Sequence, residues 1–176
     1  MIKSKTMSWA APILMAASLT ACAKMEPAKP AADTSKIADA VKADAQAAVA
    51  ALNAHDADKA VSHDAPSIIG MFHGAPNLSG PAEDLASTKQ QLADPAFHLT
   101  ISNENVDVAS GGDMAIYRAS YTATLTDPKT KKPMTELGNW VVQYKPQADG
   151  SWKMALSVVA DTPAASATAA PAAEKK

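Results

Sequence analysis

Apolar residues recur at helical spacing across residues 36–53, and this pattern predicts an amphipathic helix. Either Thr34 or Ser35 is expected to cap its N-terminus, because a hydroxyl oxygen can accept hydrogen bonds from the first unpaired amide groups. The apolar positions on the predicted inner face are Ile37, Val41, Ala45, Ala48, Val49 and Leu52.

Two more helices and one short strand are expected before the middle of the chain. Asp56 can cap a short helix that ends by Pro66. The apolar run Ser67–Phe72 is typical of a buried strand. Pro81 suits the first position of a third helix, which Pro95 should stop.

Residues after the third helix alternate between apolar and polar side chains, as half-buried strands do. The sequence Asn103-Glu104-Asn105 interrupts the first alternation and predicts a bend or a bulge there. Glycine-rich turns separate the later segments. The predicted strands span residues 97–108, 114–126, 135–145 and 152–159. This order predicts an α+β fold, with helices packed on one side of a curved sheet of consecutive antiparallel strands.

The first residues are expected to be an export signal. Lys3 and Lys5 precede an uncharged stretch, residues 7–21, which is shorter than a bilayer-spanning helix. Its end, Leu19-Thr20-Ala21-Cys22, resembles a bacterial lipobox, in which the cysteine is lipidated and becomes the new N-terminus. Ordinary secretory cleavage is the alternative, because Ala21-Cys22-Ala23 also has the small-x-small form.

Four segments follow from this pattern: a signal peptide over residues 1–21, a lipid-anchored flexible tether over 22–34, a folded domain over 35–162 and a disordered Ala/Pro tail over 163–176. The expected location is the periplasmic side of a bacterial envelope membrane. The outer membrane is favoured, because alanine rather than aspartate follows Cys22. A soluble periplasmic or secreted protein is the alternative.

The composition excludes several classes of function. The net charge is −2, and this mild acidity argues against nucleic acid as a partner. The single cysteine allows no disulfide within the chain. No metal is expected, because no two of the four histidines have the spacing of a metal-binding pair. No phosphate-binding glycine loop is present, and no cofactor is expected.

Asp64 and His73 are the first candidates for a site. Asp64 can act as a general base if burial raises its pKa from about 3.9 toward neutrality. The simpler interpretation is a turn aspartate that accepts from nearby backbone amides. His73 follows the predicted strand and can reach the rim of a pocket, or it can lie on the surface.

Three residues of the second half are candidate ligand contacts. Arg118 is the only arginine and can bind a carboxylate or phosphate in a bidentate manner, or it can pair with Glu136 across a hairpin. Tyr117 and Trp140 can line an apolar pocket and offer a polar tip, or they can belong to the core or to a dimer interface.

A family resemblance lies in several blocks of the chain. The blocks are Asp64-Ala65, Tyr117-Arg118-Ala119-Ser120-Tyr121, Gly138-Asn139-Trp140 and Asp149-Gly150-Ser151-Trp152-Lys153. Together they resemble the nuclear transport factor 2-like superfamily over about residues 36–162, and within it the bacterial ketosteroid-isomerase-like and polyketide-cyclase-like group. The resemblance implies a cone: a strongly curved antiparallel sheet packed on three N-terminal helices, with a pocket at the open end. It also implies homodimers through the sheet, and Asp64 matches the family's aspartate.

The expected function is binding of a small, partly apolar molecule, or of a partner protein, without turnover. Related sequences carry an acidic or amide residue on the last strand, whereas Ser157 and Ala160 stand near those places here. The base and oxyanion donor needed for proton transfer are therefore not both evident. One alternative is an isomerase, cyclase or hydrolase with Asp64 as general base. Another is a structural homodimer of the envelope.

Overall fold

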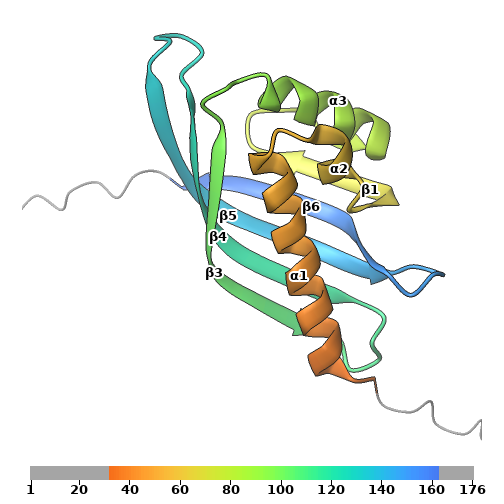
Figure 1. The fold of residues 1–176 in the computed structure, drawn as a ribbon. Coiled ribbons are helices and arrows are strands. Elements are labelled where there is room, and N and C mark those ends of the chain that lie inside the picture. Colours follow the sequence, from red (N-terminus) through yellow and green to blue (C-terminus); the bar gives the residue numbers. More distant parts are fainter. Residues whose placement is uncertain (1–31, 163–176) are drawn as a thin grey trace, which may run out of the picture. The chain divides into compact units, whose positions relative to one another are not determined.

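Three helices precede most of the sheet in the computed structural model, which describes residues 32–162 (Figure 1). They are α1 (Thr34–Asn53), α2 (Ala57–Val61) and α3 (Pro81–Leu92). The predicted signal peptide, Cys22, most of the predicted tether and the predicted tail lie outside the described residues. None of the helices in the described range is long and apolar enough to span a bilayer.

The cap of α1 differs from the expectation. The side chain of Asp33 accepts a hydrogen bond from the Lys36 amide at 3.3 Å, so Asp33 is the N-cap and not Thr34 or Ser35. The Ser35 hydroxyl instead donates to the Asp33 carboxylate at 2.8 Å. A carboxylate that accepts from both groups also complements the positive end of the helix dipole.

The caps of the other two helices are confirmed. Asp56 accepts from the Lys59 amide at 3.0 Å and opens α2. Pro81 occupies the start of α3 after Gly80, whose φ of 81° lies in the region that glycine favours. The Glu83 carboxylate reaches back to the Ser79 amide at 2.7 Å, which fixes the entry into α3.

The sheet has six strands in the order β2-β1-β6-β5-β4-β3. Their bounds are β1 (Asp64–Phe72), β2 (Leu78–Ser79), β3 (His98–Val108), β4 (Ala115–Thr126), β5 (Pro133–Pro146) and β6 (Trp152–Thr162). The expectation of a wholly antiparallel sheet is wrong at one pairing, because β1 runs parallel to β6. The sheet is therefore mixed, since the chain passes through β2, α3 and three further strands before β6 returns beside β1.

Local details of the strands refine the expected boundaries. β1 begins at Asp64, three residues before the apolar run, and the two-residue β2 was not expected. The predicted irregularity in β3 is confirmed: the register with β4 shifts between Ser102 and Asn105, and Asn103 has a φ of 54°.

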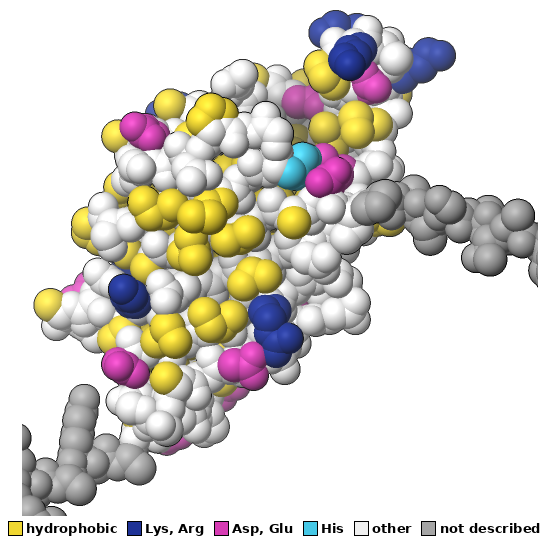
Figure 2. Space-filling view, turned by 180° about the vertical axis from the view of Figure 1, so that it is seen from behind, with side chains coloured by type: hydrophobic (Ala, Val, Ile, Leu, Met, Phe, Trp, Pro, Cys, Tyr) yellow, Lys and Arg dark blue, Asp and Glu magenta, His cyan; other side chains and the backbone are white. Residues whose placement is uncertain are grey.

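The core lies between α1 and the inner face of the sheet, which the helices cover (Figure 1). Tyr117, Val142 and Tyr144 point inward from β4 and β5 and have no exposed surface. Figure 2 shows the opposite, uncovered face, where apolar side chains gather beside a few charged ones. Exposed Leu137 and Val141 on β5 belong to the outward-facing positions of that strand.

Candidate functional site

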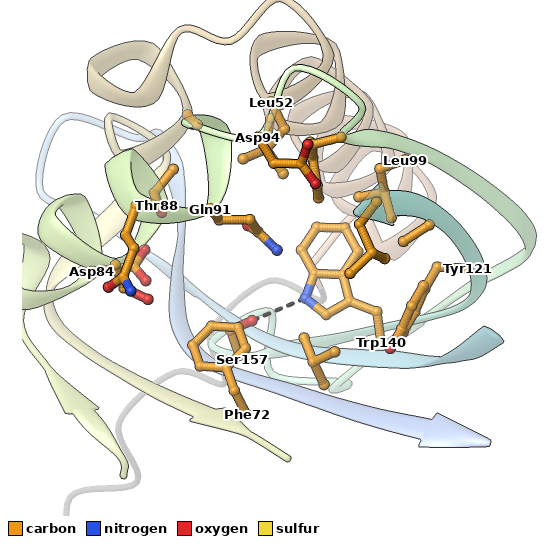
Figure 3. Close-up of a pocket in the computed structure, with 18 of the residues that line it drawn as sticks. Leu52, Phe72, Asp84, Thr88, Gln91, Asp94, Leu99, Tyr121, Trp140 and Ser157 are labelled. Carbon is orange, nitrogen blue, oxygen red and sulfur yellow. Dashed lines mark hydrogen bonds between the residues drawn. The ribbon is translucent and has the colours of Figure 1, made fainter. Parts of the chain in front are cut away.

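A pocket of about 650 Å³ lies between the helices and the inner face of the sheet (Figure 3). The indole of Trp140 stands in the middle of the view, with Tyr121 on one side and Asp84 of α3 on the other. Four aromatic side chains line it: Phe72, Phe97, Tyr121 and Trp140. Its size is that of sites which enclose small organic molecules.

Two carboxyl groups from different elements meet in the pocket lining. Asp64 begins β1 and Asp84 lies in the first turn of α3, and the two side chains share a hydrogen bond. Asp64 and Tyr144 both pair with Met154 of β6, so Asp64 lies on the same, helix-covered face as the buried Tyr144. Two carboxyls can share a hydrogen bond only if one of them holds a proton.

The proton belongs to Asp64. Burial raises the pKa of Asp64 to about 8, and the charge and hydrogen bond of Asp84 add to the shift. Burial also raises the pKa of Asp84, although the hydrogen bond from Asp64 opposes this. Oδ2 of Asp64 is buried and accepts from no donor within residues 32–162, which disfavours an ionised Asp64 still further. The shared hydrogen bond thus favours Asp64 as the protonated donor and Asp84 as the acceptor.

Charged groups outside the pocket also act on Asp64. Lys153 on β6 favours its ionised form, while Asp44 on α1 disfavours it. The Lys153 ammonium donates to the Ser62 carbonyl and is not part of the pocket lining. Asp44 is paired with His63, whose Nδ1 lies 2.7 Å from Oδ1 of Asp44. Neither group neutralises the carboxyl pair from inside the pocket.

Trp140 lines the pocket and is held by two neighbours. Its indole N–H donates to the Ser157 hydroxyl at 2.9 Å, a bond that Figure 3 shows as a dashed line. Its ring meets Tyr117 edge to face, with 5.4 Å between ring centroids. Tyr117 itself is fully buried behind Trp140 and is not part of the lining. Its hydroxyl donates to Glu104 at 3.2 Å, so Tyr117 supports the pocket wall without reaching a ligand.

His73 lies at the pocket rim among acidic side chains. Its Nε2 is 3.5 Å from Glu136 and its Nδ1 is 3.8 Å from Asp161. The Tyr121 hydroxyl donates to Glu136 at 2.5 Å. The ring of Tyr121 lies so close to Gly138 on β5 that a Cβ there would overlap it. The glycine therefore allows Tyr121 to lie flat along the pocket wall.

Arg118 lies outside the pocket, on the outer face of the sheet. Its guanidinium donates to Asp107 at 2.6 Å and to Asn105 at 2.8 Å, both on β3. The expected pairing with Glu136 is wrong, because Arg118 is in register with Val141 of β5. Glu136 lines the pocket on the inner face, so the two side chains lie on opposite sides of the sheet.

Sequence reasoning missed the polar side of α3. Asp84, Thr88 and Gln91 are spaced i, i+4 and i+7, and all three line the pocket. Thr88 is buried although it is polar. The available signal was that these three polar residues follow one another at helical spacing, next to the apolar positions Leu85 and Leu92.

No three His, Cys, Asp or Glu side chains within the described range are placed to hold a metal ion. The pocket instead presents two hydrogen-bonded carboxyl groups, the Gln91 amide and an apolar aromatic floor. Such a set can orient a small molecule by hydrogen bonds, and it can pass a proton to or from that molecule.

Comparison with known proteins agrees with this architecture. A ketosteroid isomerase-like protein from Erwinia carotovora atroseptica is 20% identical, with 71% of this chain and 96% of that chain covered and a TM-score of 0.61. A protein of the NTF2-like family from Streptomyces avermitilis is 18% identical, with coverage of 76% and 100% and a TM-score of 0.64. Hexachlorocyclohexane dehydrochlorinase LinA-type3 from Novosphingobium barchaimii LL02 is 14% identical, with coverage of 75% and 91% and a TM-score of 0.62.

These identities are low, so the likeness to the three structures establishes the fold alone. No curated protein is similar enough in sequence to match the chain. The sequence profile of the SnoaL-like domain does match, over residues 41–160, a range that holds α2, α3, the whole pocket lining and nearly all of the sheet. The chain therefore belongs to the SnoaL-like domain family, with the α+β fold of the NTF2-like proteins.

Proposed function

We propose that this domain binds a small, partly apolar molecule in the pocket between α3 and the sheet. The observation that carries the proposal is the lining itself: an aromatic floor faced by the Asp64–Asp84 carboxyl pair. A core that only stabilises the fold has no need of an open space of about 650 Å³ bordered by a half-buried acid pair. An apolar pocket with few convergent polar groups is the usual form of a small-molecule site.

A pocket-filling variant tests this proposal. Gln91 is exposed on α3 and its side chain reaches toward Trp140 (Figure 3), so Gln91→Trp places an indole in the pocket without disturbing the core. Ala86 is exposed on the same helix outside the lining, so Ala86→Trp is the matched control. The measurement is a thermal-shift screen of small apolar and amphiphilic molecules on the native chain and both variants.

A molecule that binds the native pocket at a hundred times its Kd should stabilise the fold by about 2.7 kcal/mol. We expect such molecules to stabilise the native chain and Ala86→Trp, but not Gln91→Trp. A screen that stabilises none of the three proteins contradicts the proposal. Stabilisation that persists in Gln91→Trp also contradicts it, because the molecule then binds elsewhere.

Proton-transfer catalysis is a second candidate, favoured by the carboxyl pair. Asp64 can donate a proton while Asp84 accepts one, so the pair contains an acid and a base for an isomerisation or an elimination. Turnover of a pocket ligand should then fall by at least a hundredfold in Asp64→Asn while its binding persists. If the native chain and Asp64→Asn turn the ligand over equally, or if neither does, binding without catalysis by Asp64 is the function.

The cellular place of the domain is a separate proposal that is supported only by residues 1–22. A basic start, an apolar stretch and Leu19-Thr20-Ala21-Cys22 support export and lipid anchoring at an envelope membrane. A homodimer through the sheet stays a prediction drawn from the family resemblance.

A further inference from the structure

The charges around the pocket have one sign. The part of the lining that comes from residues 32–162 contains four carboxyl groups and one imidazole, and neither lysine nor arginine. These titratable side chains are Asp64, Asp84, Asp94, Glu136 and His73. An anionic ligand would meet repulsion from several sides, whereas a cation would meet attraction.

Two of the four carboxyl groups already have donors. Asp94 accepts from the backbone and side chain of Thr126 at 2.6 and 2.9 Å, and from the Ala96 amide at 3.0 Å. Glu136 accepts from the Tyr121 hydroxyl and lies 3.5 Å from His73. These two groups add negative potential, but their oxygens are largely occupied.

The Asp64–Asp84 pair differs, because each carboxyl has mainly the other as its partner. Oδ2 of Asp64 is buried and has no donor among the side chains and backbone of residues 32–162. The groups that face Asp64 from other elements are Asp44 on α1, whose Oδ1 lies 2.7 Å from Nδ1 of His63, Tyr144 on β5, and Lys153 on β6. Lys153 donates to the Ser62 carbonyl and lies outside the lining. Within the described part of the chain, the pair therefore lacks a countercharge on its pocket side.

The aromatic floor suits the same kind of ligand. Phe72, Phe97, Tyr121 and Trp140 all line the space next to the acids. Aromatic faces attract a cation through their quadrupole and also accept apolar groups. The pocket thus offers acids for a positive charge and rings for the apolar part attached to it.

We propose that the ligand of this pocket is an apolar amine, whose ammonium group lies between Asp64 and Asp84 while its apolar part packs against Trp140. This inference rests on the proposed small-molecule function and names its ligand class. The ammonium supplies the countercharge that a shared proton supplies in the free protein. On binding, the proton of Asp64 passes to the buffer, and both carboxylates accept hydrogen bonds from the ammonium.

Proton release gives the proposal a characteristic pH dependence. Because Asp64 of the free protein is mostly protonated at pH 7 and mostly ionised at pH 9, binding of the ammonium should tighten as the pH rises through this range. The affinity should rise by up to about tenfold per pH unit below the pKa of Asp64 and should level off above it.

Three probes of matched shape test the ligand class: 2-phenylethylamine, 2-phenylethanol and 3-phenylpropanoate. Binding is followed by the NMR signal of the Trp140 indole N–H, which lies in the pocket, and protons released are counted by calorimetry in two buffers of different ionisation enthalpy. We expect the amine to bind at least tenfold more tightly than the alcohol, the carboxylate to bind most weakly, and the amine to release close to one proton at pH 7.

Comparison of the variant Asp84→Asn with the control Asp39→Asn tests whether the ammonium group binds beside Asp84. Asp84→Asn should remove the preference for the amine while leaving the alcohol's affinity within about threefold, and Asp39→Asn, on the exposed side of α1, should change neither. Equal or tighter binding of the alcohol or the carboxylate, or no binding of the amine, overturns the amine proposal. The pocket-binding proposal fails separately, if the screen with Gln91→Trp yields no pocket ligand at all.

Discussion

Asp64, at the start of β1, and Asp84, in the first turn of α3, share a hydrogen bond on the wall of the pocket. The rest of β1 and all of β2 lie between them along the chain, so the fold brings them together. Burial, with the charge and hydrogen bond of Asp84, raises the pKa of Asp64 to about 8. The pair thus places a second polar group beside Asp64 from α3 and not from the last strand. Ser157 on that strand is instead occupied as the acceptor for Trp140.

The raised pKa of Asp64 predicts that stability falls as the pH rises. An aspartate with its usual pKa loses its proton near pH 4 in the unfolded chain, but Asp64 keeps it in the folded state up to about pH 8. Between these values the folded state binds more protons than the unfolded state, so the free energy of unfolding decreases with pH. Asp64→Asn removes this effect, and its melting temperature should depend less on pH between 5 and 8.

The measurement is thermal unfolding of the native chain, Asp64→Asn and Asp39→Asn at several pH values. Asp39 is exposed on α1, so its replacement should leave the native pH dependence intact. The prediction is wrong if Asp64→Asn and the native chain lose stability in parallel across this range.

Trp140 should depend on Ser157 for part of its contribution to stability. Ser157→Ala removes the acceptor of the indole N–H and should cost about 1 kcal/mol. Trp140→Phe removes this bond together with buried ring volume and should cost about 1–3 kcal/mol.

Chemical denaturation of both single variants and the double variant measures the coupling. Because the two changes remove the same hydrogen bond, the double variant should be about 1 kcal/mol more stable than the sum of the single effects predicts. Simple additivity would show that the bond to Ser157 contributes nothing.

Arg118 should matter little for stability and not at all for pocket binding. Its ion pair with Asp107 is exposed on the outer face of the sheet, where such pairs contribute about 0–1 kcal/mol. Arg118→Gln should therefore stay within about 1 kcal/mol of the native chain and bind any pocket ligand with unchanged affinity. A marked loss of ligand affinity, measured by calorimetry, would restore the interpretation of Arg118 as a ligand contact.

Cys22 is predicted to carry the lipid anchor of the mature protein. More than one acyl chain is needed for stable anchoring, so mass spectrometry of the protein purified from membranes should show a multiply acylated N-terminal cysteine. Cys22→Ser should release the protein from the membrane fraction. An unmodified N-terminus beginning after Cys22 would instead establish ordinary secretion.

The local sequence was sufficient to predict those features of the fold that depend on residues close together in the chain. The caps at Asp56 and Pro81 and the irregularity at Asn103 follow from neighbouring residues. Asp33 was missed as a cap because two hydroxyl residues follow it directly, and only the geometry decides which oxygen accepts.

The site depended on relationships that no local pattern contains. For Asp84 the local sequence indicates only a favourable charge in the first turn of a helix, because its partner lies on another element. The error at Arg118 came from strand register: the true register places Glu136 opposite Ala123 and on the other face. The parallel pairing of β1 with β6 likewise depends on where the chain returns, which periodicity does not show.

The most direct test of the account is an NMR titration of the Asp64 side-chain carboxyl carbon between pH 3 and pH 10, assigned by comparison with Asp64→Asn. We expect a midpoint near 8, which should move toward the usual aspartate value in Asp84→Asn, because that variant removes the neighbouring charge. A midpoint near 4 in the native chain would contradict the shared proton, and with it both the acid–base role of Asp64 and the release of a proton when an amine binds.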